Sequence, residues 1–182
     1  MLKQFRNFFN KFLVAIKYNK KDYQILKNKG KSFFNLKDYE KANDLFTKAF
    51  EINNQDDELL KFKGLSNINL KIEDDLEIAL KASKKAGDII MKYYKHDYEI
   101  NEKGYHNPVT TADKEADSFL KNTLLDARPD YGWLSEETID SASRLSKERV
   151  WIVDPLDGTK EFIEGVSQFV VSVGLVQNGK PI

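Results

Sequence analysis

The sequence has no cysteine among its 182 residues, which excludes disulfide bonds and thiolate metal sites and is compatible with a reducing compartment. It also lacks an excess of charge of one sign, because 29 basic residues balance 29 acidic ones, and its composition therefore gives no argument for a nucleic-acid partner. No apolar run approaches the roughly 20 residues that a transmembrane helix requires. These absences indicate a soluble chain, which we expect to be cytoplasmic.

The first segment, residues 1–21, carries basic residues and no acidic ones. Its leucine, isoleucine and phenylalanine residues recur at helical spacing, which predicts a basic amphipathic helix. Three roles remain open for this helix. It could contact an anionic membrane surface, direct the chain to an organelle, or pack on the element that follows.

A different pattern covers residues 22–72 and has the spacing of a tetratricopeptide repeat, whose period is about 34 residues. Gly30 and Ala42 are small where two antiparallel helices would cross, and Gly64 repeats Gly30 in a second, incomplete unit that ends before the acidic residues 73–75. The pattern predicts an N-terminal helical hairpin that could bind a protein partner, with a generic helical hairpin as the alternative. The residues that carry it are Leu26, Gly30, Phe33, Ala42, Phe46 and Ala49.

Helical and extended patterns alternate in the next part of the chain. A long amphipathic helix is predicted over residues 74–95, with Leu76 and Leu80 on one face. Residues 107–111 are predicted to be extended, because a proline biases the residue before it away from the helical region. Asp113 is placed at the start of another helix, where it could simply satisfy free backbone amides.

The stretch from Trp151 to Phe162, which reads WIVDPLDGTKEF, organises the rest of the chain. The apolar run of residues 150–153 predicts a buried strand. We expect this strand to end on Asp154, because Pro155 forbids both a further ladder bond and an ordinary helical turn.

The residues just after this strand are predicted to form a binding site. Gly158 permits close backbone approach, and Thr159 could then cap a short helix. Asp154 and Asp157 would thus lie at the carboxyl end of a strand, facing the start of a helix. Carboxylate and carbonyl oxygens suit Mg²⁺, and a helix start favours phosphate. The pattern predicts metal-assisted phosphate chemistry.

Three motifs in this order resemble the lithium-sensitive, Mg²⁺-dependent phosphatases related to inositol monophosphatase. They are Pro-Val-Thr-x-x-Asp at residues 108–113, Leu-Ser-Glu-Glu at 134–137 and Asp-Pro-Leu-Asp-Gly-Thr at 154–159. The extension Lys-Glu-Phe at 160–162 looks most like the 3′(2′),5′-bisphosphate nucleotidase branch. The resemblance covers roughly residues 76–182 and implies the N-terminal half of a layered α/β sugar-phosphatase fold, so that the whole chain is expected to be α+β.

The resemblance also implies a site that holds two Mg²⁺ ions, an attacking water and a phosphate. Asp113 and Thr159 would together orient and deprotonate the water. The amides of Gly158 and Thr159 would hold the phosphate, with Glu136 beside the substrate. The implied metal ligands are Glu136, Asp154, Asp157 and the carbonyl oxygen of Leu156. Taken without the resemblance, the adjacent Glu136 and Glu137 would be interpreted as solvated surface charge.

The chain departs from the family pattern in its length. The family carries a further metal aspartate in a Trp-Asp-x-Ala motif, and neither tryptophan of this chain is followed by aspartate. The dipeptide Asn178-Gly179 predicts a hairpin turn, yet only residues 180–182 follow it. We therefore expect residues 73–182 to form a truncated phosphatase domain that lacks activity by itself. His96 and His106 have no metal-ligand spacing and are expected to lie on the surface.

Two functions of different classes follow. The first is Mg²⁺-dependent hydrolysis of a small phosphorylated substrate, with adenosine 3′,5′-bisphosphate converted to AMP and phosphate. Inositol phosphate is the alternative substrate within the same class. The second function is that of a non-catalytic interaction module, in which the repeat-like helices of residues 22–72 bind a protein partner.

Overall fold

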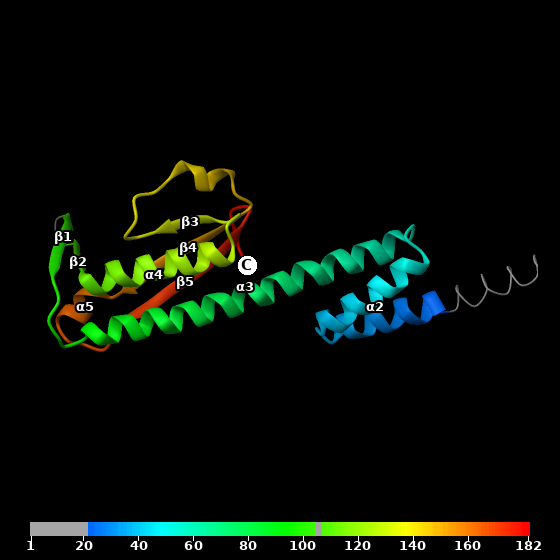
Figure 1. The fold of residues 1–182 in the computed structure, drawn as a ribbon, viewed down its shortest axis with the longest axis horizontal. Helices are drawn as coiled ribbons and strands as arrows, with labels where there is room; N and C mark the ends of the chain where they lie inside the picture. The colour runs from blue at the N-terminus through cyan, green and yellow to red at the C-terminus, as the bar shows by residue number, and fades with distance from the viewer. Residues whose placement is uncertain (1–21, 105–106) are drawn as a thin grey trace, which may run out of the picture. The chain divides into compact units, whose positions relative to one another are not determined.

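A computed structural model describes residues 22–104 and 107–182 of the chain (Figure 1). The chain divides into two units, residues 1–74 and residues 75–182. The helix predicted for residues 1–21 lies outside the described residues, as does His106. None of the helices that the structure describes is both long and apolar enough to cross a membrane.

The first unit is helical. A helix over residues 22–35 is followed by a short turn and by α2, Tyr39–Ile52, and α3 then begins at Asp57. Gly30 is required at the helix crossing, because a Cβ atom there would lie 2.5 Å from the Phe46 ring. The helices and the turn lie where the repeat pattern predicts them, whereas their tetratricopeptide ancestry stays a prediction. The buried residues of its hydrophobic core are Tyr23, Ala42, Phe46, Ala49 and Leu59.

Helix α3 differs from the prediction in length and in its buried face. It runs without interruption over Asp57–Tyr93, so the break expected near residues 73–75 is wrong. No glycine or proline occurs there to end a helix, and Asp75 turns inward to bind cationic partners instead of starting a turn. Leu76 and Leu80 are 58% and 62% exposed, and small residues further along the helix form the buried face in their place.

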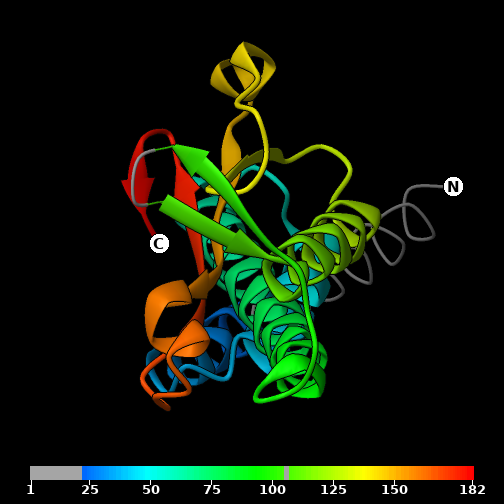
Figure 2. The same cartoon turned by 90° about the vertical axis from the view of Figure 1, so that its left-hand side faces the viewer.

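The second unit contains a four-stranded sheet with the strand order β3-β4-β5-β6. β3 and β4 are parallel, whereas β5 pairs antiparallel with both β4 and β6. A separate antiparallel pair, β1 and β2, precedes the sheet in the chain and is visible as paired arrows in Figure 2. The strands are β1 Ile100–Gly104, β2 Asn107–Thr110, β3 Gly132–Ser135, β4 Arg149–Asp157, β5 Val170–Gln177 and β6 Lys180–Pro181.

Two helices share one core with the sheet. α4, Thr111–Ala127, begins close to the predicted Asp113, and the later part of α3 joins it. Two short elements complete the unit, the 3-10 helix η1, Ala142–Ser146, and α5, Thr159–Ile163. The α+β prediction is confirmed. The core is formed by Ala82, Ala86 and Ile90 of α3, Ala116, Leu120 and Leu124 of α4, and Trp151 and Val153 of β4.

The predicted hairpin turn at the end of β5 is also confirmed. Asn178 and Gly179 have φ angles of 50° and 78°. Positive φ at both central residues is the geometry of a type I′ turn, whose twist matches that of the flanking strands. The turn returns the chain to β6, which pairs Gln177 with Lys180 and Val176 with Pro181.

A buried ionic network joins four elements of the second unit. Asp75 of α3 is 1% exposed, and one of its carboxylate oxygens accepts from Arg128 Nε at 2.6 Å. The other oxygen accepts from Tyr131 Oη and from Arg149 Nη1, each at 2.6 Å. These partners stand at the end of α4, before β3 and at the start of β4. The network therefore fixes the amino-terminal end of β4 against both helices.

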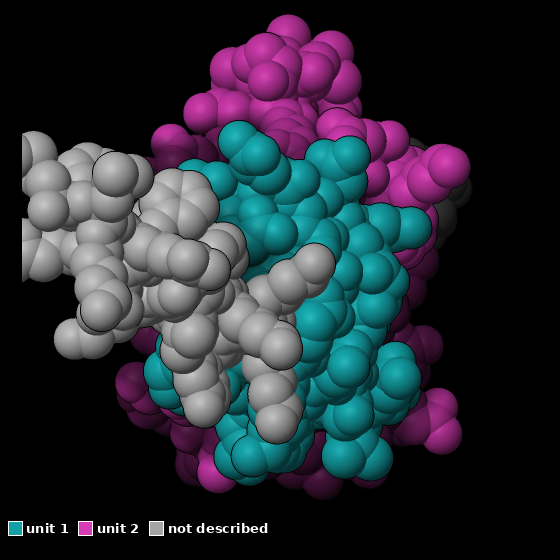
Figure 3. All heavy atoms as spheres, turned by 90° about the vertical axis from the view of Figure 1, so that its right-hand side faces the viewer, with its two compact units in different colours: residues 1–74 teal, residues 75–182 magenta. Residues whose placement is uncertain are grey.

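Removing the charge of this carboxylate should destabilise the second unit. Asp75→Asn leaves two guanidinium groups without their counter-ion, one of them buried, and should lower the free energy of unfolding by about 3 kcal/mol. Both tryptophans belong to residues 75–182, the magenta unit of Figure 3, so urea denaturation followed by tryptophan fluorescence reports on this unit. The exposed neighbour provides the control, since Asp74→Asn should change that free energy by less than about 0.5 kcal/mol. Equal midpoints for the two variants would contradict this role.

Two glycine substitutions should have opposite effects on stability. Gly158 has a φ of 98°, and a Cβ atom there would lie 2.6 Å from the carbonyl oxygen of Gln168. Gly158→Ala should therefore lower the free energy of unfolding by about 1–3 kcal/mol. Gly87 lies within α3 with nothing near its missing Cβ, and Gly87→Ala should raise stability by about 0.5–1 kcal/mol. Thermal unfolding of both variants checks the signs, and a stabilised Gly158→Ala protein would show the prediction to be wrong.

Candidate active site

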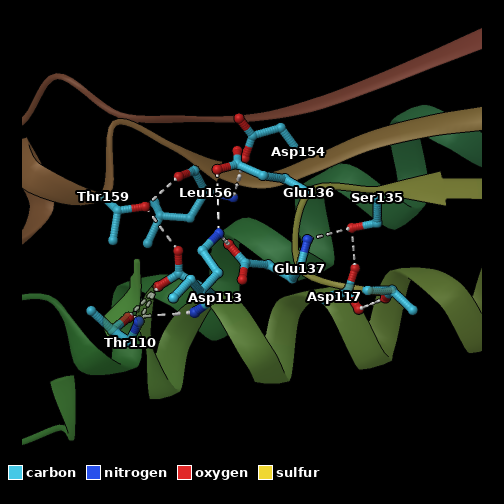
Figure 4. A network of polar contacts seen from close by, with 11 residues as sticks. Thr110, Asp113, Asp117, Ser135, Glu136, Glu137, Asp154, Leu156 and Thr159 are labelled. Atoms are coloured by element: carbon cyan, nitrogen blue, oxygen red, sulfur yellow. Dashed lines mark hydrogen bonds and ion pairs between the residues drawn. The ribbon is translucent and has the colours of Figure 1, made fainter. Parts of the chain in front are cut away.

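The candidate site forms where β3 and β4 end. Because the two strands are parallel and pair Ser135 with Val153, their carboxyl ends lie at the same edge of the sheet. The amide of Glu136 donates to the carbonyl of Val153 at 3.1 Å, which places Glu136 beside Asp154 (Figure 4). Two carboxylates that the family resemblance implies as metal ligands are thus brought together by strand pairing.

β4 continues past the point where the sequence predicts its end. It runs to Asp157, and its pairing with β5 is irregular between Asp154 and Asp157. This irregularity accommodates Pro155, which has no amide hydrogen for a regular ladder. The amide of Leu156 instead donates to Asp154 Oδ1 at 3.2 Å.

Thr159 does not cap a helix, and that part of the prediction is wrong. Gly158 occupies the cap position in the left-handed conformation, and α5 begins with Thr159 itself. The hydroxyl of Thr159 lies 2.9 Å from Asp113 Oδ1 and 3.0 Å from the carbonyl oxygen of Leu156, and it can donate to either. Because Gly158 takes the cap position, the Thr159 hydroxyl does not cap the helix and faces the site instead.

Asp113 is held from two sides. It is fully buried, and its Oδ2 accepts from the amide of Thr110 at 2.8 Å and from the Thr110 hydroxyl. The Asp113 amide in turn donates to the Thr110 hydroxyl oxygen at 3.4 Å, and this bond and the one from the Thr110 amide form a capping box at the start of α4. Its other oxygen accepts from the Thr159 hydroxyl. Asp113 therefore satisfies a helix start and faces the site at the same time, and the structure brings it together with Thr159 as the resemblance implies.

Negative charge is concentrated around Asp154. Burial, a hydrogen bond with Glu136 and the charges of Glu136 and Asp157 raise the pKa of Asp154 to about 7. A cation bound among these groups would relieve the repulsion, and hard carboxylate and carbonyl oxygens are the donors that Mg²⁺ prefers. Among the residues that the structure describes, no three carboxylate or imidazole groups lie close enough to form a complete metal site by themselves. The donors fit Mg²⁺ in kind.

Sequence reasoning missed a second pair of residues at this site. Lys103 of β1 places its Nζ 2.8 Å from Glu137 Oε1 and 3.3 Å from Glu136 Oε1. The Glu137 side chain is only 5% exposed, so it is not the solvated surface charge that the sequence alone suggests. Burial raises the pKa of Glu137, and Lys103 opposes that shift. No local signal could have revealed the pair, because Lys103 lies 34 residues before Glu137.

A third acidic side chain supports the site from α4. Asp117 is buried, and its two carboxylate oxygens accept from the hydroxyls of Ser135 and Thr138. These two residues flank Glu136 and Glu137, so Asp117 holds the segment that carries them. Asp117 lies one helical turn after Asp113 on the same face of α4, a spacing visible in the sequence.

Two hollows open at the site. The first, of about 250 Å³, is lined by the proposed ligands and by Asn107 and Pro108 of β2. The second, of about 440 Å³, is lined by residues of α5 and by Gln168, Phe169 and Val170. Asp157, Gly158 and Glu161 line both hollows. His96 is exposed and lines neither, as the sequence predicts.

Comparison with known proteins places this site in a family. Residues 71–182, more than half of the chain, match the model of the inositol monophosphatase family. The chain is 38% identical over 114 residues to inositol monophosphatase 2 of Solanum lycopersicum, covering 61% of this chain and 43% of that protein. It is also 38% identical over 110 residues to the 3′(2′),5′-bisphosphate nucleotidase CysQ of Escherichia coli K12, covering 59% of this chain and 45% of that protein. The chain thus spans less than half the length of these relatives.

Solved structures show the same fold. The extragenic suppressor protein suhB from Bartonella henselae superposes with a TM-score of 0.56 at 33% identity, covering 59% of this chain and 42% of that chain. The IMPase from Thermotoga maritima gives a TM-score of 0.54 at 30% identity, covering 59% of this chain and 41% of that chain. The chain therefore belongs to the inositol monophosphatase family, whose relatives named here include phosphatases, and it covers part of the family's domain.

Proposed function

We propose that this site hydrolyses phosphomonoesters with the help of Mg²⁺, and that its substrate is a 3′(2′),5′-bisphosphate nucleotide such as adenosine 3′,5′-bisphosphate. The contact between the Thr159 hydroxyl and the buried Asp113 carboxylate carries the proposal. Thr159 lines the same hollow as Glu136 and Asp154, and the Asp113 carboxylate behind its hydroxyl is a potential proton acceptor for a reaction in that hollow. The activity is that of the whole protein, and we expect this length of chain alone to be inactive.

The chain's own residues can activate a water molecule. Asp113 accepts three hydrogen bonds, two from Thr110 and one from the Thr159 hydroxyl, which hold its carboxylate in place. The Thr159 oxygen keeps lone-pair capacity that can accept a hydrogen bond from water. As the water attacks phosphorus, its proton can pass to the Thr159 oxygen while the threonine proton passes to Asp113. The bond from phosphorus to the ester oxygen breaks, and the leaving oxygen takes a proton from solvent to give the alcohol. The base required for hydrolysis is thus a carboxylate acting through a hydroxyl, and no nucleophilic side chain is needed.

The carboxylates Glu136, Asp154 and Asp157, with the carbonyl of Leu156, would hold Mg²⁺. When bound, Mg²⁺ lowers the pKa of a water molecule and neutralises charge on the phosphoryl oxygens. Phosphoryl transfer requires mainly positioning and electrostatic stabilisation from the protein, which matches a site built from fixed oxygen donors. The amides of Gly158 and Thr159 would donate hydrogen bonds to the phosphate and so hold it in place.

The choice of substrate rests on the residues that follow Thr159. Relatives named as inositol monophosphatase and as bisphosphate nucleotidase are both 38% identical to this chain, so overall identity does not separate the two substrates. The sequence Lys160-Glu161-Phe162 is similar to the nucleotidase branch, which favours a nucleotide bisphosphate. Inositol phosphate is the alternative substrate.

The first unit supports a second proposal. Residues 22–70 lie outside the match to the family model and form a helical hairpin with its own buried core. We propose that this hairpin is a protein-binding module of the tetratricopeptide type. It would add a partner to the phosphatase without taking part in its chemistry.

Replacing a proposed metal ligand should abolish activity without unfolding the protein. Asp154→Asn in the native protein should lower Mg²⁺-dependent phosphate release from adenosine 3′,5′-bisphosphate by about 100-fold or more, because a bound metal contributes several kcal/mol to the transition state. Asp140→Asn, an exposed aspartate of the same unit paired with Arg144, and His96→Ala should leave the rate unchanged. Full activity in the Asp154→Asn protein would disprove the site assignment.

The proton relay predicts a sharp difference between two substitutions of Thr159. Thr159→Val keeps the shape of the side chain but removes the hydroxyl, and should reduce kcat about 100-fold with little change in KM. Thr159→Ser keeps the hydroxyl and should retain most of the activity. Steady-state kinetics of the two variants, each compared with the unsubstituted native protein, would measure kcat and KM. Equal loss in the two variants would show that Thr159 acts through packing and not through its oxygen.

A further inference from the structure

The first hollow has an uneven distribution of charge. Among the described residues that line it, four carry carboxylates, Glu136, Asp154, Asp157 and Glu161, and Lys160 alone carries a cationic side chain. Lys103 also lies beside the hollow, but its ammonium group is engaged by Glu136 and Glu137. Four acidic side chains and one lysine therefore line this hollow. A negatively charged group of a substrate would be repelled at most positions there unless a metal ion neutralised it.

Lys160 is available for such a charge. It is exposed and forms no ion pair with any residue that the structure describes. Its backbone is fixed all the same, because it is the second residue of α5 and follows Thr159, whose hydroxyl is bound to Asp113. An ammonium group on a fixed backbone at the rim of an acidic hollow can bind a phosphate that approaches from solvent.

A substrate with two phosphates needs this second contact. The phosphate that is hydrolysed would lie among the metal-binding carboxylates, whereas the other would experience repulsion from Asp157 and Glu161. We propose that Lys160 binds the phosphate that is not hydrolysed and so selects bisphosphorylated over monophosphorylated substrates. This inference rests on the proposed phosphatase function and adds the residue that determines its specificity. A substrate such as inositol phosphate, with one phosphate and neutral hydroxyls elsewhere, would make no use of this charge.

Binding of two nucleotides that differ by one phosphate tests the assignment. Isothermal titration calorimetry in the presence of Mg²⁺ would measure the Kd of adenosine 3′,5′-bisphosphate and of adenosine 3′-monophosphate for the native protein, with Asp113→Asn in every sample so that the nucleotides are not hydrolysed during the titration. Lys160→Gln should weaken binding of the bisphosphate about tenfold, the usual value of one hydrogen bond to a charged group, and change binding of the monophosphate less than about twofold. Lys160→Arg should keep most of the preference for the bisphosphate.

Lys147→Gln is the matched control. Lys147 is exposed and lies just before β4, at the end of the strand opposite to Asp157, and its substitution should change neither Kd. Equal weakening of both nucleotides by Lys160→Gln, or no weakening, would overturn the role of Lys160 and leave the phosphatase proposal intact. A native protein that binds neither nucleotide would overturn both. Selective loss of the bisphosphate in Lys160→Gln alone would support the inference.

Discussion

The repulsion between carboxylates at the end of β4 is the constraint on which the rest of the second unit depends. Parallel strand pairing holds Asp154 close to Glu136. Asp157, which follows the irregular pairing of β4 with β5, adds a further negative charge. Left to itself such a cluster would separate, because like charges in a partly buried site disfavour each other. It persists because each carboxylate is carried by backbone that is fixed elsewhere. The irregular pairing at Pro155 fixes Asp154, and Gly158 fixes the turn that follows.

The two ends of β4 have opposite electrostatic character. At the amino-terminal end, the guanidinium groups of Arg149 and Arg128 both bind the buried carboxylate of Asp75. At the carboxyl-terminal end, acids outnumber cations and the site is open to solvent. Favourable ionic contacts are therefore concentrated at one end of the strand, and electrostatic repulsion is concentrated at the other. The buried network at the first end can offset the cost of repulsion at the second.

The sequence could predict those features whose cause is local. The turn at Asn178 and Gly179 and the helix that starts near Asp113 follow from residue types that only a few backbone conformations accept. The contact between Asp113 and Thr159 was implied by family resemblance, since no spacing rule relates residues 46 positions apart. Local signals also misled. The acidic run that ends at Asp75 suggests a helix end, but its buried partners lie 53 and 74 residues further along the chain. A helix continues when distant groups satisfy its side chains, and no window of sequence contains that information.

Some residues of the site would have the same role in every relative, whereas others can distinguish the substrates of different relatives. In the proposed reaction, Asp113, Glu136 and Asp154 would serve any phosphomonoester, because they would act on the phosphoryl group and on water. Residues just beyond Thr159 would instead contact the part of the substrate next to that group. There Lys160 adds a cationic side chain to the acidic lining of the hollow. A family that retains its chemistry and changes its substrate would vary at such a rim. Equal identity to relatives named for two substrates is then expected, because most of the aligned residues form the fold and the shared chemistry, and few meet the rest of the substrate.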